Sequence, residues 1–263
     1  MNGVTPITPA PAAPFLEVAG ITVRFGGLRA VNDLSFEVAR GSIHALIGPN
    51  GAGKSTTFNC ISRYYQPSAG RIRLDGVDIT RHRPQQMAGL GVARTFQNLE
   101  LFGELSVWDN VLLGCHAHSA NRLGKLLRRP DAATRELVDG LIARVGLVPE
   151  RDTRAKDLDF GRQKLLEIAR ALALKPRLLL LDEPAAGLRN ADIEQLDRLL
   201  TELARRDGIT VLLVEHVMQL VMSISDRVTV MSFGQKLAEG TPREIAEHPE
   251  VIEAYLGKGA AHA

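Results

Sequence analysis

Apolar residues follow two different patterns along this chain. Residues 15–25 and 31–38 alternate apolar and polar positions, which predicts strands with one buried face. Residues 43–47, 178–181 and 209–214 are nearly continuous apolar runs, as is typical of strands buried inside a core. The chain therefore predicts an antiparallel β layer that precedes an α/β core.

Helical spacing of apolar residues marks three longer segments. Residues 55–63, 161–174 and 192–206 predict helices, and Lys175-Pro176 ends the second of them. Thr241 to Glu244 spells a capping box with proline at the first helical position, so a helical tail is expected over 241–257. Smaller predicted elements are a hairpin around Asp75-Gly76, a helix at 84–88, and strands at 91–96, 226–231 and 235–238.

Residues 98–164 change character, because no clear strand pattern occurs there. Ser106 to Asp109 spells a capping box that opens a helix towards His118, and residues 131–145 predict a second helix with Leu137 on its apolar face. We therefore expect an inserted helical subdomain. Four basic residues between the two helices lie near anionic lipid headgroups or form a solvated loop, and we favour the loop: Arg122, Lys125, Arg128 and Arg129.

Composition narrows the class of protein. The chain has 263 residues, 45% hydrophobic and 24% charged, and a net charge of +2, so nothing global indicates a nucleic-acid binder. Its two cysteines, Cys60 and Cys115, cannot form a disulfide framework and fit a reducing compartment. No apolar run reaches the ~20 residues of a membrane span. We expect residues 1–14 to be a flexible proline-rich tail without a signal peptide, and 258–263 a disordered end.

Residues 48–56 carry the strongest chemical signal. They fit the pattern G-x-x-x-x-G-K-[ST] between a predicted strand and a predicted helix. The glycines let successive N–H groups point at phosphate oxygens, Lys54 can reach the β- and γ-phosphates, and Ser55 offers Mg²⁺ a hydroxyl. The predicted nucleotide-binding residues here are Gly48, Pro49, Asn50, Gly51, Ala52, Gly53, Lys54, Ser55 and Thr56.

Three further sites at predicted strand ends complete a hydrolytic constellation. The run 178–181 ends in Asp182, whose carboxylate can reach the Mg²⁺ shell, and in Glu183, which can activate a water. Gln97 can contact both Mg²⁺ and that water. His216 follows the run 209–214, and its imidazole can hydrogen-bond the γ-phosphate. The predicted catalytic residues are Lys54, Gln97, Glu183 and His216, and the predicted metal ligands are Ser55, Gln97 and Asp182.

The order of these motifs resembles the nucleotide-binding subunits of ABC transporters over about residues 15–256. The resemblance rests on residues 48–56, Gln97, Leu158 to Gln163, Leu178 to Leu188 and His216. It implies a P-loop NTPase fold, with a RecA-like core, an antiparallel β subdomain and a helical subdomain. It also implies ATP and Mg²⁺ as cofactors, and two subunits that sandwich two ATP molecules.

Several segments are similar to the subunits of branched-chain amino-acid importers in particular. They are Arg94 to Asn98, Leu101-Phe102, Val107 to Val111, Asp182 to Leu188 and the tail Pro249 to Gly257. Importers of urea are close relatives and remain an alternative. The resemblance implies two membrane permease subunits and a periplasmic solute-binding protein as partners, and a location at the cytoplasmic face of the bacterial inner membrane.

The resemblance also assigns roles that the spacing alone does not. Phe25, at a predicted strand end, becomes the aromatic residue that stacks on adenine, and Gly161 the signature glycine that binds the partner's γ-phosphate. Residues 185–188 become the D-loop between subunits. Asp159, also placed in the nucleotide site, stands where the family's signature has serine, and it either turns away from phosphate or weakens binding, with Arg162 beside it as a compensating charge.

Three other classes of protein share the phosphate loop. ABC-type DNA-repair ATPases carry long coiled-coil inserts, whereas the insert here is short. Translation-associated ABC proteins have two phosphate loops in tandem, and this chain has one. A nucleotide switch with weak hydrolysis remains open because of Asp159. We expect an ATPase subunit of an importer that does not bind nucleic acid.

Overall fold

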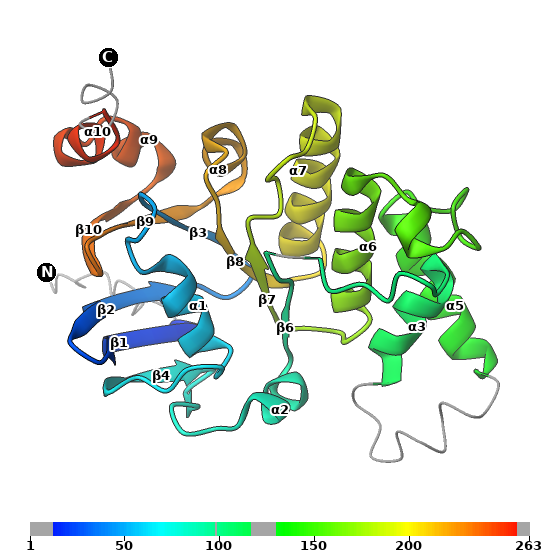
Figure 1. The fold of residues 1–263 in the computed structure, drawn as a ribbon, viewed down its shortest axis with the longest axis horizontal. Helices are drawn as coiled ribbons and strands as arrows, with labels where there is room; N and C mark the ends of the chain where they lie inside the picture. The colour runs from blue at the N-terminus through cyan, green and yellow to red at the C-terminus, as the bar shows by residue number, and fades with distance from the viewer. Residues whose placement is uncertain (1–12, 98, 117–129, 257–263) are drawn as a thin grey trace, which may run out of the picture.

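The computed structural model describes residues 13–97, 99–116 and 130–256. Two sheets organise these residues, and helices lie around them and at both ends of the molecule (Figure 1). One sheet is antiparallel with strand order β2-β1-β4-β5, and the other has the order β10-β9-β3-β8-β7-β6. The strands are β1 Leu16–Phe25, β2 Leu28–Val38, β3 Ile43–Ile47, β4 Ala69–Leu74, β5 Val77–Asp78, β6 Val92–Arg94, β7 Leu178–Asp182, β8 Thr210–Val214, β9 Arg227–Ser232 and β10 Gln235–Gly240.

The antiparallel sheet confirms the predicted β layer. Its strand β1 buries Leu16 and Val18, then Ile21 and Val23. The alternation changes phase between the two pairs because the register with β2 shifts between Val18 and Ile21. The irregularity near Gly20 thus explains why the apolar residues of this strand do not keep a strict period of two.

The second sheet is parallel from β9 to β6, and its strands are buried on both faces. In β7, Leu179 and Leu181 face a core shared with the large helices, whereas Leu178 and Leu180 face a core shared with the antiparallel sheet and α1. Both kinds of position must be apolar, so the strand reads as one continuous apolar run. The predicted α/β core is confirmed.

Most of the helices lie in three places around the sheets (Figure 1). α1 lies beside the antiparallel sheet, α3, α5 and α6 lie together at the opposite end of the molecule, and α8, α9 and α10 lie near β9 and β10. Their bounds are α1 Lys54–Ile61, α2 Pro84–Met87, α3 Val107–His116, α5 Ala132–Arg144, α6 Phe160–Leu172, α7 Asn190–Arg205, α8 Met218–Ile224, α9 Pro242–Ala246 and α10 Pro249–Leu256, with short 3₁₀ turns at Ala88–Leu90 and Ala155–Asp157.

Some expectations need correction. The loop helix begins at Lys54 and not at Ser55, and α8 has no counterpart among the predicted elements. In α5 the buried residues are Val138, Leu141 and Ile142, whereas Leu137 is half-buried. The end of the helix predicted towards His118, the basic residues 122–129 and both chain ends beyond 13 and 256 lie outside the described residues. The subdomain boundaries at 98 and 164 stay predictions.

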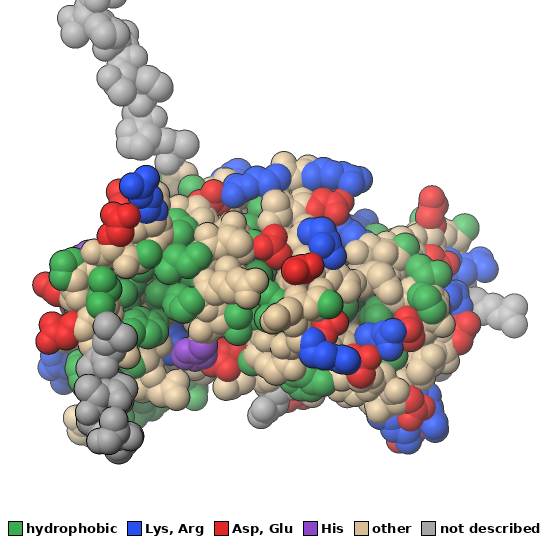
Figure 2. Space-filling view, turned by 90° about the horizontal axis from the view of Figure 1, so that it is seen from above, with side chains coloured by type: hydrophobic (Ala, Val, Ile, Leu, Met, Phe, Trp, Pro, Cys, Tyr) green, Lys and Arg blue, Asp and Glu red, His purple; other side chains and the backbone are tan. Residues whose placement is uncertain are grey.

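The surface reflects this division (Figure 2). Hydrophobic side chains gather on the half of the viewed face that lies over the sheets and α10, and side chains of both charges alternate over the helical end. None of the helices in the described ranges is long and apolar enough to cross a membrane.

Candidate functional site

The carboxyl ends of the parallel strands bring the predicted residues to one edge of the sheet. The phosphate loop follows β3, Gln97 follows β6, Glu183 follows β7 and His216 follows β8. Because parallel strands end on the same side, residues far apart in sequence meet there. These residues line one open cleft of about 550 Å³, together with Phe25, Leu28 and Phe233.

The phosphate loop owes its shape to glycine. Gly48, Gly51 and Gly53 have φ values of +148°, +81° and +99°, which L side chains rarely adopt. A Cβ atom on Gly48 would lie 2.2 Å from the carbonyl oxygen of Met231, and one on Gly53 would lie 2.5 Å from that of Ala30. The loop is therefore fixed between the main chains of β2 and β9.

The loop ends at a helix start that can bind an anion. Gly53 is the N-cap of α1 and offers no side-chain hydrogen bond to the first N–H groups of the helix. Those groups carry the positive end of the helix dipole. Lys54 is buried, and its Nζ donates to the carbonyl oxygens of Gly48 at 2.6 Å and Pro49 at 3.0 Å. An ammonium group thus lies along a backbone nest that suits phosphate.

Glu183 is the centre of the hydrolytic constellation. Its Oε1 lies 3.0 Å from Nε2 of His216, and its Oε2 accepts a hydrogen bond of 3.2 Å from Nε2 of Gln97. Glu183 adopts a left-handed φ of +50°, an unusual conformation for this residue that turns the chain at the end of β7. Three of the four predicted catalytic side chains thus meet at Glu183, although they come from three different strand ends.

Asp182 differs from its neighbour because it is buried. Its Oδ2 accepts a hydrogen bond of 2.9 Å from Nη2 of Arg94, and burial raises the pKa of the carboxyl while Arg94 opposes that rise. Its buried Oδ1 has no hydrogen-bond partner within the described part of the chain. A desolvated carboxylate oxygen and the Ser55 hydroxyl are hard donors of the kind that Mg²⁺ prefers, so these residues fit a magnesium ion.

Arg94 contacts the candidate site, although the sequence analysis assigns it no role. Besides Asp182, its Nη1 donates to Asn59 Oδ1 and to Ser62 Oγ, both at 2.7 Å. It thereby joins β6, β7 and α1 beside the site. The sequence signal is an arginine in a short apolar strand, but its partner carboxylate lies 88 positions away.

Glu215 is a second such residue. Its buried carboxylate accepts hydrogen bonds from the backbone N–H groups of Ala185 at 2.6 Å, His216 at 2.7 Å and Val217 at 2.9 Å. One side chain thus holds the predicted D-loop and the loop of the predicted switch histidine together. An acidic residue directly after an apolar strand is the only signal that the sequence offers for it.

Phe25 lies where a nucleotide base could reach it. Its ring is 46% exposed, lines the same cleft as the phosphate loop, and meets the ring of Tyr65 edge-to-face at 5.3 Å. The hydroxyl of Tyr255, in the C-terminal tail, lies near the Gly48 backbone; burial raises its pKa to about 12, and the Gly48 backbone opposes that rise.

The predicted signature loop lies on α6, away from the cleft. Asp159 is the N-cap of α6: its carboxylate accepts hydrogen bonds from the backbone N–H of Arg162 at 2.9 Å and from Nη1 of Arg162 at 3.0 Å. Gly161 is buried and faces Asp192. Neither Asp159 nor Gly161 lines the cleft that contains the phosphate loop. One chain therefore does not bring its own signature loop to its own phosphate loop.

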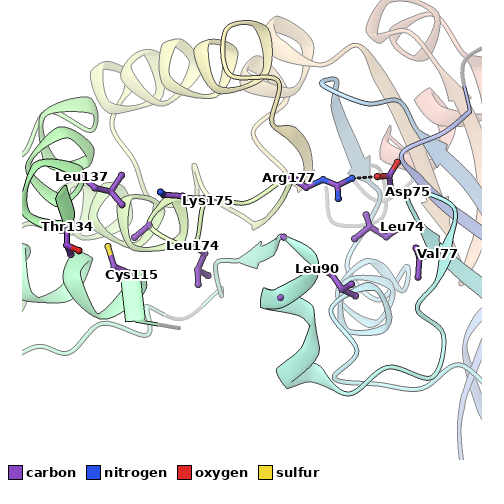
Figure 3. Close-up of a pocket in the computed structure, with 13 residues that line it drawn as sticks. Leu74, Asp75, Val77, Leu90, Cys115, Thr134, Leu137, Leu174, Lys175 and Arg177 are labelled. Atoms are coloured by element: carbon purple, nitrogen blue, oxygen red, sulfur yellow. Dashed lines mark hydrogen bonds and ion pairs between the residues drawn. The ribbon is translucent and has the colours of Figure 1, made fainter. Parts of the chain in front are cut away.

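A second cavity, of about 630 Å³, lies elsewhere (Figure 3). The hairpin residues Leu74 and Val77, Leu90, and the helical residues Cys115 and Leu137 line it, and an ion pair between Arg177 and Asp75 borders it. It lies near the start of β7 and contains no glycine-rich loop or predicted catalytic residue. Although this cavity is larger, the chemistry places the candidate site in the cleft at the other end of the strands.

A glycine-rich loop between a buried strand and a helix, with two carboxylates at the end of a neighbouring strand, defines a P-loop NTPase. Residues 31–186 match the family described as "ABC transporter", and residues 235–261 match the family described as "Branched-chain amino acid ATP-binding cassette transporter". The chain belongs to the ABC transporter ATP-binding family, whose cassettes are ATPases coupled to transport.

Relatives and solved structures agree with this assignment. The chain is 45% identical over 251 residues to the high-affinity branched-chain amino acid transport ATP-binding protein BraF of Pseudomonas aeruginosa, covering 93% of this chain and 98% of that protein. Identity to LivG of Escherichia coli strain K12, which carries the same description, is 44% with the same coverage. A nucleotide-free ATP-binding cassette superposes with a TM-score of 0.83 at 30% identity, covering 92% of this chain and 99% of that one. A cassette in its ADP conformation gives 0.84 at 30%, with coverage of 94% and 100%.

Proposed function

We propose that this chain binds ATP with Mg²⁺ and hydrolyses it to drive the import of branched-chain or related amino acids. The observation that carries the proposal is the contact of Glu183 with both Gln97 and His216 beside a phosphate loop. The substrate class is supported by the names of BraF and LivG and by the family match of the C-terminal tail.

The phosphate loop would hold the β- and γ-phosphates. Its backbone N–H groups and the start of α1 favour negative charge, and Lys54 would exchange its two carbonyl contacts for phosphate oxygens. Ser55, Asp182 and Gln97 would hold Mg²⁺, which neutralises charge on the phosphate oxygens when bound. Phe25 would stack on adenine, because its exposed ring lines the same cleft.

Glu183 would act as the general base. A water oxygen forms a bond to the γ-phosphorus, the bond from that phosphorus to the oxygen of ADP breaks, and the water proton passes to the carboxylate of Glu183. Gln97 and His216 each contact one of the two carboxylate oxygens, so the carboxylate has a defined orientation. His216 would then hydrogen-bond the departing phosphate.

The site is completed by a second subunit. Gly161 and Asp159 lie outside the cleft of their own chain, which fits a dimer in which each signature loop covers the other subunit's ATP. Residues 185–188 would form the D-loop between the two. The dimer would work from the cytoplasmic face of the bacterial inner membrane on two permease subunits, which receive solute from a periplasmic binding protein.

The substitution Glu183→Gln tests the proposal. It keeps the size of the side chain and one acceptor oxygen but removes its basicity, so ATP turnover should fall at least about a hundredfold while ATP still binds and a dimer accumulates. Glu194→Gln, the same change at an exposed position of α7, is the control. Full turnover in Glu183→Gln, measured by phosphate release, would contradict the general-base role.

A further inference from the structure

The helix α6 presents three charged side chains to the segment that follows β6. Lys164, Glu167 and Arg170 are spaced three residues apart, so they lie along one edge of the helix. Lys164 and Glu167 are only 4% and 2% exposed, and Arg170 is half-buried. Buried charges are retained only where they have partners, yet none of the three has a role in the proposed function.

The partners of these side chains are on both sides of Gln97. Oε1 of Glu167 accepts a hydrogen bond of 3.1 Å from the backbone N–H of Phe96, and the nearby main chain of Glu100 acts on the same carboxylate to lower its pKa. Nζ of Lys164 donates to the carbonyl oxygen of Gln97 at 3.4 Å. The chain crosses α6 at this point on its way to α3 (Figure 1).

Arg170 extends the same contact. Its guanidinium carbon lies 5.9 Å from the centre of the Phe102 ring. Burial raises the pKa of Glu167, and the Phe96 hydrogen bond and the charges of Lys164 and Arg170 oppose that rise. The three side chains thus form one compensated group, and their contacts reach from Phe96 to Phe102.

We propose that Glu167 is a positioning residue for hydrolysis, which fastens the segment carrying Gln97 to the helix that begins at the signature loop. The inference rests on the proposed function of Gln97 and Glu183. Because Nε2 of Gln97 contacts Glu183, a shift of the segment relative to β7 changes the surroundings of the general base. Glu167 touches neither nucleotide nor water, and acts through the main chain.

The contacts that fasten the Gln97 segment to α6 through Glu167, here called the clamp, also connect the signature loop with its own subunit's active site. Gly161 lies one and a half turns before Glu167 on the same helix. The signature loop belongs to the partner's ATP site in the proposed dimer, whereas Gln97 belongs to the chain's own site. The helix α6 therefore links the two ATP sites: its first turn belongs to the partner's site, and Glu167 at its centre contacts the segment of its own site.

Amide hydrogen exchange of the full chain tests the clamp directly. In Glu167→Ala, exchange of the backbone amide of Phe96 should accelerate roughly tenfold or more, because it loses its acceptor, while the amides of residues 43–58 keep their rates. Glu167→Gln retains one carbonyl oxygen and should be intermediate. Glu194→Gln is the exposed control and should match the unmodified protein. Unchanged exchange at Phe96 in Glu167→Ala would overturn the clamp.

Kinetics separate positioning from packing. Glu167→Ala should lower kcat about tenfold with ATP affinity within about twofold, and Glu167→Gln should recover most of kcat. Equal losses of ATP affinity and kcat, with faster exchange throughout the chain, would reduce Glu167 to a core residue. A loosened segment with unchanged kcat would also refute the positioning role. If the unmodified chain fails to hydrolyse ATP, the proposed function fails, and the exchange result still decides the clamp.

Discussion

The phosphate loop, residues 48–56, and the signature loop, residues 158–163, are held in place by different parts of the chain. Main-chain atoms of Met231 and Ala30 enclose the phosphate loop so closely that Gly48 and Gly53 have no room for a Cβ. The signature loop is held by side chains: Asp159 caps α6, and Nε2 of Gln163 donates to the carbonyl oxygens of Ala155 and Leu158.

The difference explains why the phosphate loop keeps the family's sequence motif and the signature loop departs from it. A loop enclosed by main chain accepts almost no added atoms, whereas a loop held by side chains accepts any residue that makes the same bonds. Asp and Ser are both good N-caps, so Asp159 can replace serine without loss of the helix start. Four changes test this contrast, from the largest expected effect to the smallest.

Gly48→Ala should be the most damaging. Its Cβ would lie 2.2 Å from the Met231 carbonyl oxygen, and neither backbone can move without disturbing β3 or β9. We expect a loss of about 3 kcal/mol or more in the free energy of unfolding, measured by chemical denaturation. Gly51→Ala is the control, since nothing lies within 4 Å of its Cβ and only its φ of +81° is strained, at about 1 kcal/mol. Equal losses would mean that the enclosure is unimportant.

His44, on the strand that leads into the phosphate loop, should make this region sensitive to acid. Burial lowers its pKa from 6.5 to about 4, and its Nε2 lies 2.9 Å from Thr229 Oγ1. Between these two values the unfolded chain binds a proton that the folded chain does not, so stability falls as pH falls from about 6.5 to about 4. The full effect is about 3 kcal/mol.

Denaturation of His44→Gln at pH 7 and pH 5 measures this effect. The variant should lose less stability than the unmodified chain over that interval, because glutamine does not titrate. An identical loss in both proteins would show that other groups carry the acid response.

Lys54→Ala removes the side-chain part of phosphate binding and leaves the backbone nest. ATP affinity should fall by about 2 kcal/mol, or roughly thirtyfold, as measured by calorimetry. Lys175→Ala, at an exposed lysine beside the second cavity, should leave affinity unchanged. Equal losses in the two variants would mean that the loop does not bind phosphate through Lys54.

Asp159→Ala should have the smallest effect. It removes the cap of α6 and should lower the free energy of unfolding by about 1 kcal/mol, whereas Asp159→Ser should keep most of that stability. If both variants are equally unstable, the carboxylate has a role beyond the cap. The comparison uses the same denaturation measurement as Gly48→Ala.

The sequence predicts the strands and the site well where the signal is local or follows from strand order. Continuous apolar runs gave the parallel sheet, and because parallel strands end together, Gln97, Glu183 and His216 could be expected to meet. The helix α8 was missed because its N-cap, Val217, makes no side-chain cap hydrogen bond. Nothing in the local sequence marks such a start.

Hydrogen-bond partners that lie far apart in the chain cannot be predicted from one sequence, for a physical reason. Arg94 and Asp182 lie 88 positions apart, and Ala185 and Glu215 lie 30 apart. A single sequence shows that a charge stands beside an apolar strand, but not which group neutralises it. The predicted roles of Phe25, Gly161 and Asp159 came from family resemblance and stay predictions.

Glu215 limits the substitutions that this protein can tolerate during evolution. Its carboxylate accepts hydrogen bonds from three N–H groups that belong to two separate loops. No other residue type can accept all three from this position. Glutamine offers a single acceptor oxygen, and aspartate is one methylene shorter. A mutational library would therefore return an almost invariant residue here, although Glu215 does not line the cleft, and variation in either loop would be confined to side chains that leave those three bonds intact.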